Sequence, residues 1–232
     1  MSSIPNVLFE DRWLVLINKP AGVLSHPNPK GKADEVCAFE GTYDFEEKCF
    51  TSPERRLWLI HRLDQDTSGV LLAAKDAKTA DACRAAFSQN AVRKIYVALA
   101  AGGGLAKQGV WLDHLMVNHQ RKQVRTEVVR GRAPNAEARY KLIHYSPLTR
   151  LSLIEIELIT GKTHQIRVQC ASRHLPIVGD DVYGDFTLNR KLRRDLGIRR
   201  LMLHARSLSM KHPGTGQPLM VEAPLPNEFQ QV

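Results

Sequence analysis

Two short apolar runs, Leu57–Ile60 and Val70–Ala74, flank a polar stretch with one His, one Arg and two Asp residues. Runs of four or five apolar residues are too short for helices and are typical of buried strands. The spacing predicts a strand–turn–strand unit in which residues 67–69, Thr-Ser-Gly, supply the turn. A carboxylate beside the end of a buried strand must be paired or hydrogen-bonded. Asp64 is therefore a candidate reagent, whereas Asp66 fits an ordinary turn.

The segment after the second run predicts a helix over residues 77–90. Asp76 can cap this helix, because its carboxylate can accept hydrogen bonds from the unpaired N–H groups of the first turn. Ala80, Cys83 and Phe87 follow at helical spacing. This spacing predicts that one side of the helix faces the core.

Strands dominate the rest of the chain. Ile154, Ile156 and Leu158 alternate with glutamates, as expected for a strand with one wet face. No regular βαβ alternation and no glycine-rich phosphate loop is present. The sequence therefore predicts an α+β fold with a mixed, mostly antiparallel sheet, in one domain that covers residues 1–232. Further strands are expected at 13–17, 23–24, 94–101 and, around a turn at 213–214, within 201–224.

Three segments are rich in polar residues. Residues 27–56 contain several Pro, Gly and charged residues and are predicted to form a long loop or an excursion of low core content. Residues 121–139 carry six Arg and Lys against two Glu and fit a β-hairpin with its turn at Gly131. Residues 190–200 form a second basic cluster. Both basic segments are candidates for contact with a polyanion.

The overall charge favours nucleic acid as a partner. The chain has 33 Lys and Arg against 24 Asp and Glu, a formal net charge of +9. An anionic membrane is a poorer match, because no basic amphipathic helix with a broad apolar face is visible. No stretch approaches the ~18 apolar residues of a membrane helix, and no secretory signal begins the chain. We therefore expect a cytoplasmic protein.

The four cysteines do not indicate a metal site. They form no CxxC pair, and no Cys–His spacing resembles a zinc site. We expect reduced, structural thiols and no bound metal.

Another candidate site lies at the start of a second predicted helix. Thr163 can cap a short helix that runs to about Ser172. Lys162, His164 and Arg167 fall near this helix end, which attracts anions through its free N–H groups and its dipole. Arg167 could hold a carboxylate with two parallel hydrogen bonds, which Lys cannot do. A surface helix start with solvated charges would show the same pattern.

Lys94 and Tyr96 share one face of a predicted strand. Tyr96 could be a core aromatic residue with a satisfied hydroxyl, or it could belong to a site.

Together these stretches resemble the RluA family of RNA pseudouridine synthases. Residues 61–69, HRLDQDTSG, resemble the central motif of that family, and residues 18–22, NKPAG, resemble its first motif. KIYVA at 94–98 resembles the tyrosine motif, and GKTHQIRV at 161–168 resembles the third motif. The resemblance continues through LHA at 203–205 and so covers most of the chain.

This resemblance implies a curved sheet with flanking helices and a central RNA-binding cleft. It also implies isomerisation of uridine to pseudouridine in ribosomal or transfer RNA, without a cofactor or a metal. Asp64 matches the essential aspartate of the family, Tyr96 its active-site tyrosine and Arg167 the basic partner of the aspartate. Arg62 matches an arginine that can occupy the place of the flipped base. We expect a monomer with no obligatory protein partner.

Other polar residues of the motifs are candidates for RNA contact. Lys162 stands where the family often has Arg, and Gln169 stands where the third motif often continues with His. These two differences from the family pattern bear on contacts with the substrate rather than on the reaction itself. The chain begins close to the first motif, so we expect no N-terminal S4 domain and RNA recognition by the catalytic domain itself. The further candidates are His61, Thr67, Lys94, Lys162, His164 and Gln165.

The chemistry requires an ionised carboxylate beside the ribose. Asp64 could act as a nucleophile at C1′ or as a base that removes a proton from the sugar, and the residues leave both roles open. A catalytically silent RNA-binding protein could keep the fold, but it has no chemical need for Asp64, Tyr96 and Arg167 together. A glycoside-type hydrolase needs a second carboxylate facing the cleft, and only Asp66, in the same turn, lies nearby in sequence.

Overall fold

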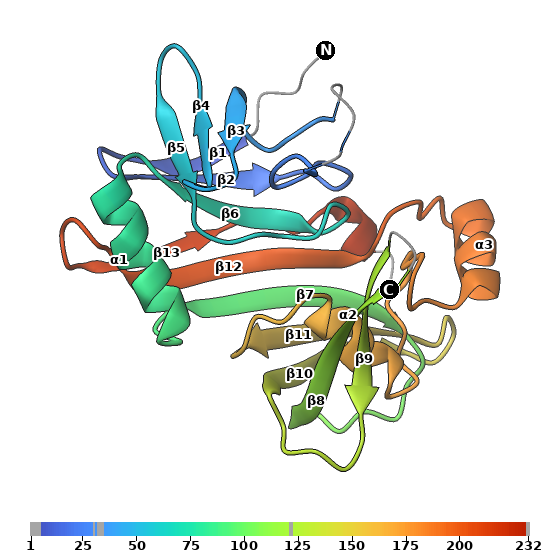
Figure 1. Cartoon of the computed structure of the whole chain (residues 1–232). Coiled ribbons are helices and arrows are strands. Elements are labelled where there is room, and N and C mark those ends of the chain that lie inside the picture. Colours follow the sequence, from blue (N-terminus) through green and yellow to red (C-terminus); the bar gives the residue numbers. More distant parts are fainter. Residues whose placement is uncertain (1–5, 30, 32–34, 121–122, 231–232) are drawn as a thin grey trace. The chain divides into compact units, whose positions relative to one another are not determined.

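The computed structural model describes residues 6–29, 31, 35–120 and 123–230, and the chain forms two compact units (Figure 1). Unit 1 consists of Met1–Arg93 and Ala205–Pro224. Unit 2 consists of Lys94–His204 and Leu225–Val232. Unit 1 is therefore made from two separated stretches of the chain, with the main part of unit 2 inserted between them.

Unit 1 is built on antiparallel strands. β2 pairs with β1 and with β6, β5 also pairs with β6, and β12 pairs with β13. The strands predicted on both sides of the polar stretch are confirmed as β5 and β6, and those predicted around the turn at 213–214 as β12 and β13. The strands are β1 (Asn6–Glu10), β2 (Leu14–Lys19), β3 (Thr42–Asp44), β4 (Cys49–Thr51), β5 (Arg56–Leu59), β6 (Ser68–Ala74), β12 (Leu203–Lys211, in this unit from Ala205 onward) and β13 (Pro218–Glu222).

The core of unit 1 forms where α1 (Ala77–Ser88) covers these strands. Ala80 and Cys83 of the helix are buried in one cluster with Leu72 of β6 and Leu208 of β12. The carboxylate of Asp76 accepts a hydrogen bond from the Thr79 N–H at 2.8 Å, so the predicted cap is confirmed. The cap and the apolar face together fix where the helix begins and how it is rotated.

The segment 27–56 is not one long loop. It contains β3 and β4, which pair with each other, and β4 pairs with β5. Cys49 and Phe50 of β4 are buried, as is Phe39. Because β3 and β4 have only three residues each, their apolar alternation was too short to identify them in the sequence.

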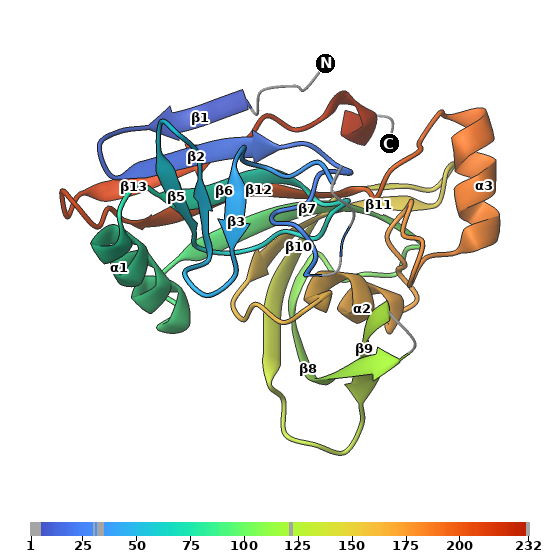
Figure 2. The ribbon, with the colours of Figure 1, turned by 45° about the horizontal axis from the view of Figure 1, so that its top comes forward.

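Unit 2 contains a second run of antiparallel strands in the order β7-β11-β10-β8-β9. α2 packs against β8 and β9 (Figure 2). Ile154, Ile156 and Leu158 are buried while the glutamates between them are partly exposed, as predicted for this strand. The elements are β7 (Arg93–Ala101), β8 (Gln108–Gln120), β9 (Gln123–Val129), β10 (Ala136–Ser146), β11 (Leu151–Leu158), α2 (Gln165–Ala171), α3 (Phe186–Asp195) and the 3₁₀ helix Asn227–Gln230.

The hairpin predicted over residues 121–139 is wrong in its pairing. β9 pairs with β8, and the connection between them is at residues 121–122, which lie outside the described residues. Gly131 instead lies in the turn between β9 and β10, and β10 pairs with β8. The Gly signal marked a real turn, but β8 is the partner on both sides.

No helix within the described ranges is long and apolar enough to cross a membrane. The four cysteines carry free thiols, and Cys49, Cys83 and Cys170 are buried.

The close approach of β6 to β12 generates a stability prediction. Gly69 of β6 has φ = +112°, and a Cβ atom there would collide with the backbone of Ala205. We expect Gly69→Ala to lower the free energy of unfolding in urea by about 3 kcal/mol or more, because backbone strain and steric collision add.

Gly131→Ala is the matched control. Gly131 also has a positive φ, +76°, but an added Cβ would meet no atom within 4 Å. We expect it to cost only about 1 kcal/mol, from the backbone conformation alone. Equal losses in the two variants would contradict the steric argument.

Candidate active site

The polar stretch of residues 60–67 connects β5 to β6 in unit 1. Ile60 donates its N–H to the Leu72 carbonyl at 3.2 Å, which fixes the start of the connection. Arg62 and Asp66 are exposed, whereas Asp64 is half-buried. The stretch therefore contains one partly shielded carboxylate.

Residues 19–25 hold this connection beyond Asp64. Lys19, at the end of β2, is completely buried. Its ammonium group donates to the carbonyl oxygens of Pro20, Val23 and Gln65 at 2.9, 2.6 and 2.9 Å. Gly22 adds two bonds to Gln65, through its N–H to the Gln65 carbonyl at 3.0 Å and through its carbonyl from the Gln65 amide at 3.1 Å. The residue after Asp64 is thus fixed by three hydrogen bonds to the first motif.

The residue before Asp64 is fixed as well. The hydroxyl of Ser25 donates to the Leu63 carbonyl at 2.8 Å and accepts from the Leu63 N–H at 3.0 Å. The carbonyl of Asp64 itself accepts from the Thr67 N–H at 3.1 Å, which closes a turn over residues 64–67. The turn predicted at residues 67–69 is wrong in position, because Ser68 and Gly69 belong to β6. The backbone of Asp64 is consequently held on both sides, as a reacting group requires.

His61 and Arg62 differ in their surroundings. The ring of His61 stacks on Phe87 with centroids 5.0 Å apart, and its Nε2 atom accepts from the Leu72 N–H at 3.2 Å. These contacts give His61 a packing role.

Arg62 lies near a second histidine, His26. Burial lowers the pKa of His26, and the charge of the nearby Arg62 lowers it further. Arg62 is thus an exposed charge beside a half-buried, neutral ring.

Unit 2 contains the tyrosine motif on β7. Tyr96 and Lys94 are both buried, and Tyr96 lies opposite Ile156 of β11. The Lys94 ammonium donates to the Ile159 carbonyl at 3.5 Å, and burial lowers the pKa of Lys94. Both residues lie on β7 and are two positions apart, so they share one face of the strand as predicted.

The start of α2 differs from the prediction. The capping residue is His164, with φ = 54° and without a side-chain cap bond, rather than Thr163. The buried side chain of Gln165 fixes the start of α2 instead. Its oxygen accepts from the Lys162 N–H at 3.0 Å, and its amide donates to the Glu137 carbonyl at 3.0 Å. Gln165 uses its polar atoms within the protein, while Lys162 is exposed.

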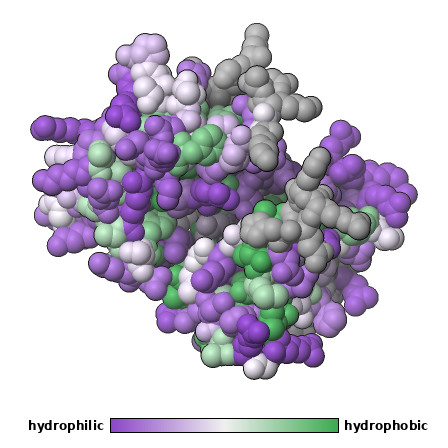
Figure 3. Space-filling model, viewed as in Figure 1, coloured by the Kyte–Doolittle hydropathy of each residue, from purple (hydrophilic) through white to green (hydrophobic). Residues whose placement is uncertain are grey.

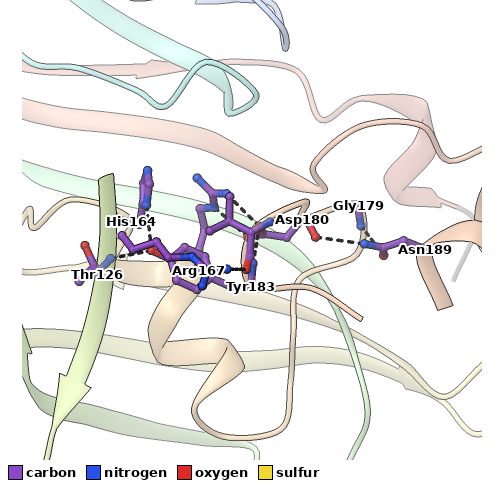
Figure 4. A network of polar contacts seen from close by, with 9 residues as sticks. Thr126, His164, Arg167, Gly179, Asp180, Tyr183 and Asn189 are labelled. Atoms are coloured by element: carbon purple, nitrogen blue, oxygen red, sulfur yellow. Dashed lines mark hydrogen bonds and ion pairs between the residues drawn. The ribbon is translucent and has the colours of Figure 1, made fainter. Parts of the chain in front are cut away.

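Arg167 of α2 is buried and paired with Asp180 (Figure 4). Its Nε and Nη2 atoms donate to the two carboxylate oxygens at 2.8 and 2.9 Å. Burial raises the pKa of Asp180, but the hydrogen bonds and charge of Arg167 outweigh this effect, so the pKa lies below its ordinary value. Asp180 was not among the residues predicted from the sequence. The rule that a buried Arg needs a carboxylate, applied to the Gly179-Asp180 step, could have identified it.

The predicted residues therefore fall into two groups. Within unit 2, Tyr183 connects His164 and Arg167: its hydroxyl lies 3.0 Å from His164 Nδ1, and its ring lies under the Arg167 guanidinium. That Asp64 meets Tyr96 and Arg167 in one site stays a prediction. Unit 1 contributes His61, Arg62, Asp64 and Thr67, and unit 2 contributes Lys94, Tyr96, Lys162, His164, Gln165 and Arg167.

Comparisons with known proteins agree on one family. A family model described as RNA pseudouridylate synthase matches residues 13–172. The tRNA pseudouridine synthase C of Salmonella typhi is 35% identical over 97% of this chain and 87% of its own length. The ribosomal large subunit pseudouridine synthase C of Yersinia pestis is 32% identical over 97% of this chain and 67% of its own. Among solved structures, human RNA Pseudouridylate Synthase Domain Containing 4 superposes with a TM-score of 0.72 at 26% identity, over 97% and 90% of the two chains.

Proposed function

Because the chain belongs to the RluA family of RNA pseudouridine synthases, we propose that it isomerises specific uridines in ribosomal or transfer RNA, with Asp64 as the essential carboxylate. The family and the α+β pseudouridine synthase fold predicted from the sequence are confirmed. The observation that carries the proposed role of Asp64 is its place in the chain. It is the half-buried carboxylate of a connection whose backbone is fixed on both sides.

Both kinds of RNA stay in the proposal. One relative is named for transfer RNA and another for the large ribosomal subunit, at similar identities of 35% and 32%. A substrate of either kind agrees with the net charge of +9.

The proposed reaction is an isomerisation. The N1–C1′ bond of uridine breaks, the uracil turns, and a C5–C1′ bond forms. The proton on C5 then leaves, and N1 ends with a proton, so that the atoms balance without any redox change. Asp64 would start the reaction as an ionised carboxylate beside the ribose, and we favour removal of a sugar proton over attack at C1′. Asp64 would return this proton to the sugar when the C5–C1′ bond forms.

Arg167 and Tyr96 have supporting roles in this proposal. Arg167 would keep Asp64 ionised and oriented, since a guanidinium close to a carboxylate favours its charged form. Tyr96 would stack under the uracil and assist the loss of the C5 proton. Arg62, which is exposed, would fill the space that the flipped base leaves.

The role of Asp64 gives the first prediction. Asp64→Asn keeps the size and hydrogen-bonding shape of the side chain but removes its charge, so tritium release from uridine labelled at C5 should fall below detection. Binding of the same RNA should stay within about threefold, because the bonds that fix this loop use backbone groups and other side chains. Turnover by the variant would exclude Asp64 as the reagent, and parallel loss of binding would point to a structural aspartate.

Tyr96 separates cleavage from reattachment. We expect Tyr96→Phe to bind RNA and to break the glycosidic bond but to release C5 tritium at a rate at least ~10²-fold lower, the usual range for a lost general acid–base group. Single-turnover assays that follow free-base formation and tritium release separately test this. A wild-type rate of tritium release would end the proposed role.

Helix α3 is the clearest basic surface for the RNA backbone. Figure 3 shows the region of α3, at the right of the view, as mostly hydrophilic. Arg190, Lys191 and Arg193 are exposed, whereas Arg194 is already paired with Asp195 at 2.8 Å. Arg125, in the other basic segment, is exposed but donates to the Val182 carbonyl at 3.1 Å.

A charge reversal on α3 tests this surface. We expect Lys191→Glu to reduce the magnitude of the negative slope of log K for RNA binding against log salt concentration by about 0.7 to 0.9, the value for one phosphate contact. Lys141→Glu is the matched control, because Lys141 is an exposed lysine on β10 outside both basic segments. Equal slopes for the Lys191 variant and the wild type would remove α3 from the RNA-binding surface.

A further inference from the structure

We propose that Asp180 is a positioning residue for the reaction: its carboxylate fixes the plane of the Arg167 guanidinium and offsets part of its positive charge. This inference rests on the proposed function, because it acts through the role given to Arg167. It concerns a residue that lies outside every motif singled out in the sequence and outside residues 13–172 of the family match.

Asp180 and Arg167 form a bidentate pair. Both carboxylate oxygens of Asp180 are used, one on Nε at 2.8 Å and one on Nη2 at 2.9 Å. Two parallel bonds to the same edge of a guanidinium fix its plane, whereas a single bond allows rotation. The side chains are 9% and 0% exposed, so water does not compete for these bonds. The other N–H groups of Arg167 are thereby aimed in a defined direction.

One face of the Arg167 guanidinium is also covered. The guanidinium carbon lies 5.3 Å from the centroid of the Tyr183 ring. The Tyr183 hydroxyl accepts from the Thr126 N–H at 2.8 Å and lies 3.0 Å from His164 Nδ1. Tyr183 is therefore fixed at its far end by β9 and by the start of α2. Asp180 and Tyr183 contact the guanidinium from its edge and from its face (Figure 4).

The turn at residues 179–184 is held independently of Arg167. One carboxylate oxygen of Asp180, Oδ1, also accepts from the N–H groups of Val182 and Tyr183 at 2.8 and 3.0 Å. Asn189 of α3 accepts from the Gly179 N–H at 2.8 Å and donates to the Asp180 carbonyl at 3.1 Å. The carboxylate is thus placed by its own turn and by α3, as expected of a group that orients another.

The Asp180 carboxylate also offsets the charge of Arg167. The lowered pKa of Asp180 keeps it ionised at neutral pH, so the Arg167–Asp180 pair is close to neutral as a whole. His164, Tyr183 and Cys170 are further titratable groups beside this pair in the described part of the chain. An Arg without a counter-ion would stabilise an ionised carboxylate strongly and make it a weaker base. The pair can instead orient a carboxylate by hydrogen bonding with less loss of basicity.

Asp180→Asn tests the proposal with little change of shape. The amide retains Oδ1 as an acceptor for Val182 and Tyr183 but removes the charge and the Oδ2 bond to Nε. We expect kcat for C5 tritium release to fall about 10²-fold through misorientation of Arg167, with KM for RNA within about threefold. The acid limb of the kcat profile should move to lower pH, because the uncovered charge of Arg167 favours ionised carboxylate. A purely structural role for Asp180 would leave the acid limb where it is.

The control is Asp181→Asn, which makes the same chemical change at the exposed neighbouring residue. It should have wild-type kcat and a wild-type pH profile. Wild-type kcat with an unshifted profile in Asp180→Asn would overturn the proposal. Should thermal unfolding show that Asp180→Asn does not fold, Asn189→Ala decides, because it loosens the turn without touching Arg167. We then expect about a tenfold loss of kcat at unchanged KM, and no loss would overturn the proposal.

Arg167→Lys separates this inference from the function on which it rests. An inactive Arg167→Lys beside a normal Asp180→Asn would sink the positioning role alone. An Arg167→Lys variant as active as the wild type would remove Arg167 from the proposed function, and the positioning role with it.

Discussion

A completely buried ammonium group, that of Lys19, is the interaction on which the connection around Asp64 depends. A buried charge is costly unless its donors find acceptors, so the three carbonyl oxygens around Lys19 cannot move without a large penalty. One of them belongs to Gln65, the residue after Asp64. The hydrogen bonds that the buried ammonium group of Lys19 requires therefore also fix the backbone beside Asp64.

The two units of the chain hold their functional side chains by different means. The Asp64 connection is held mostly through backbone carbonyls and the Ser25 hydroxyl, so the side chains at Pro20 and Val23 take little part. Arg167 is held by a specific carboxylate and a specific ring. Substitutions in the first arrangement should be tolerated if the backbone keeps its path. In the second, only residues that reproduce a charge or a ring can serve.

The sequence predicted features whose cause is local, and it failed where the cause is distant. The cap at Asp76 and the buried strands β5 and β6 follow from neighbouring residues. The pairing of β9 with β8 does not, because Gly131 marks a turn without naming the partner strand. His164 as the cap of α2 depends on a left-handed backbone that a non-glycine residue rarely adopts. Asp180 is thirteen residues from Arg167, and only the fold brings the two together.

The insertion of unit 2 within unit 1 has a consequence for how the protein is made. Leu208 and Met210 of β12 belong to the core cluster of unit 1, yet the ribosome adds them only after the inserted stretch Lys94–His204. At roughly 5 to 20 residues per second, about 110 residues of insertion delay them by roughly 6 to 22 s. During that interval β6 lacks its β12 neighbour and presents an apolar edge, which is the kind of surface that chaperones bind. The apolar edge of β6 must therefore be kept from aggregating while unit 2 is still being synthesised.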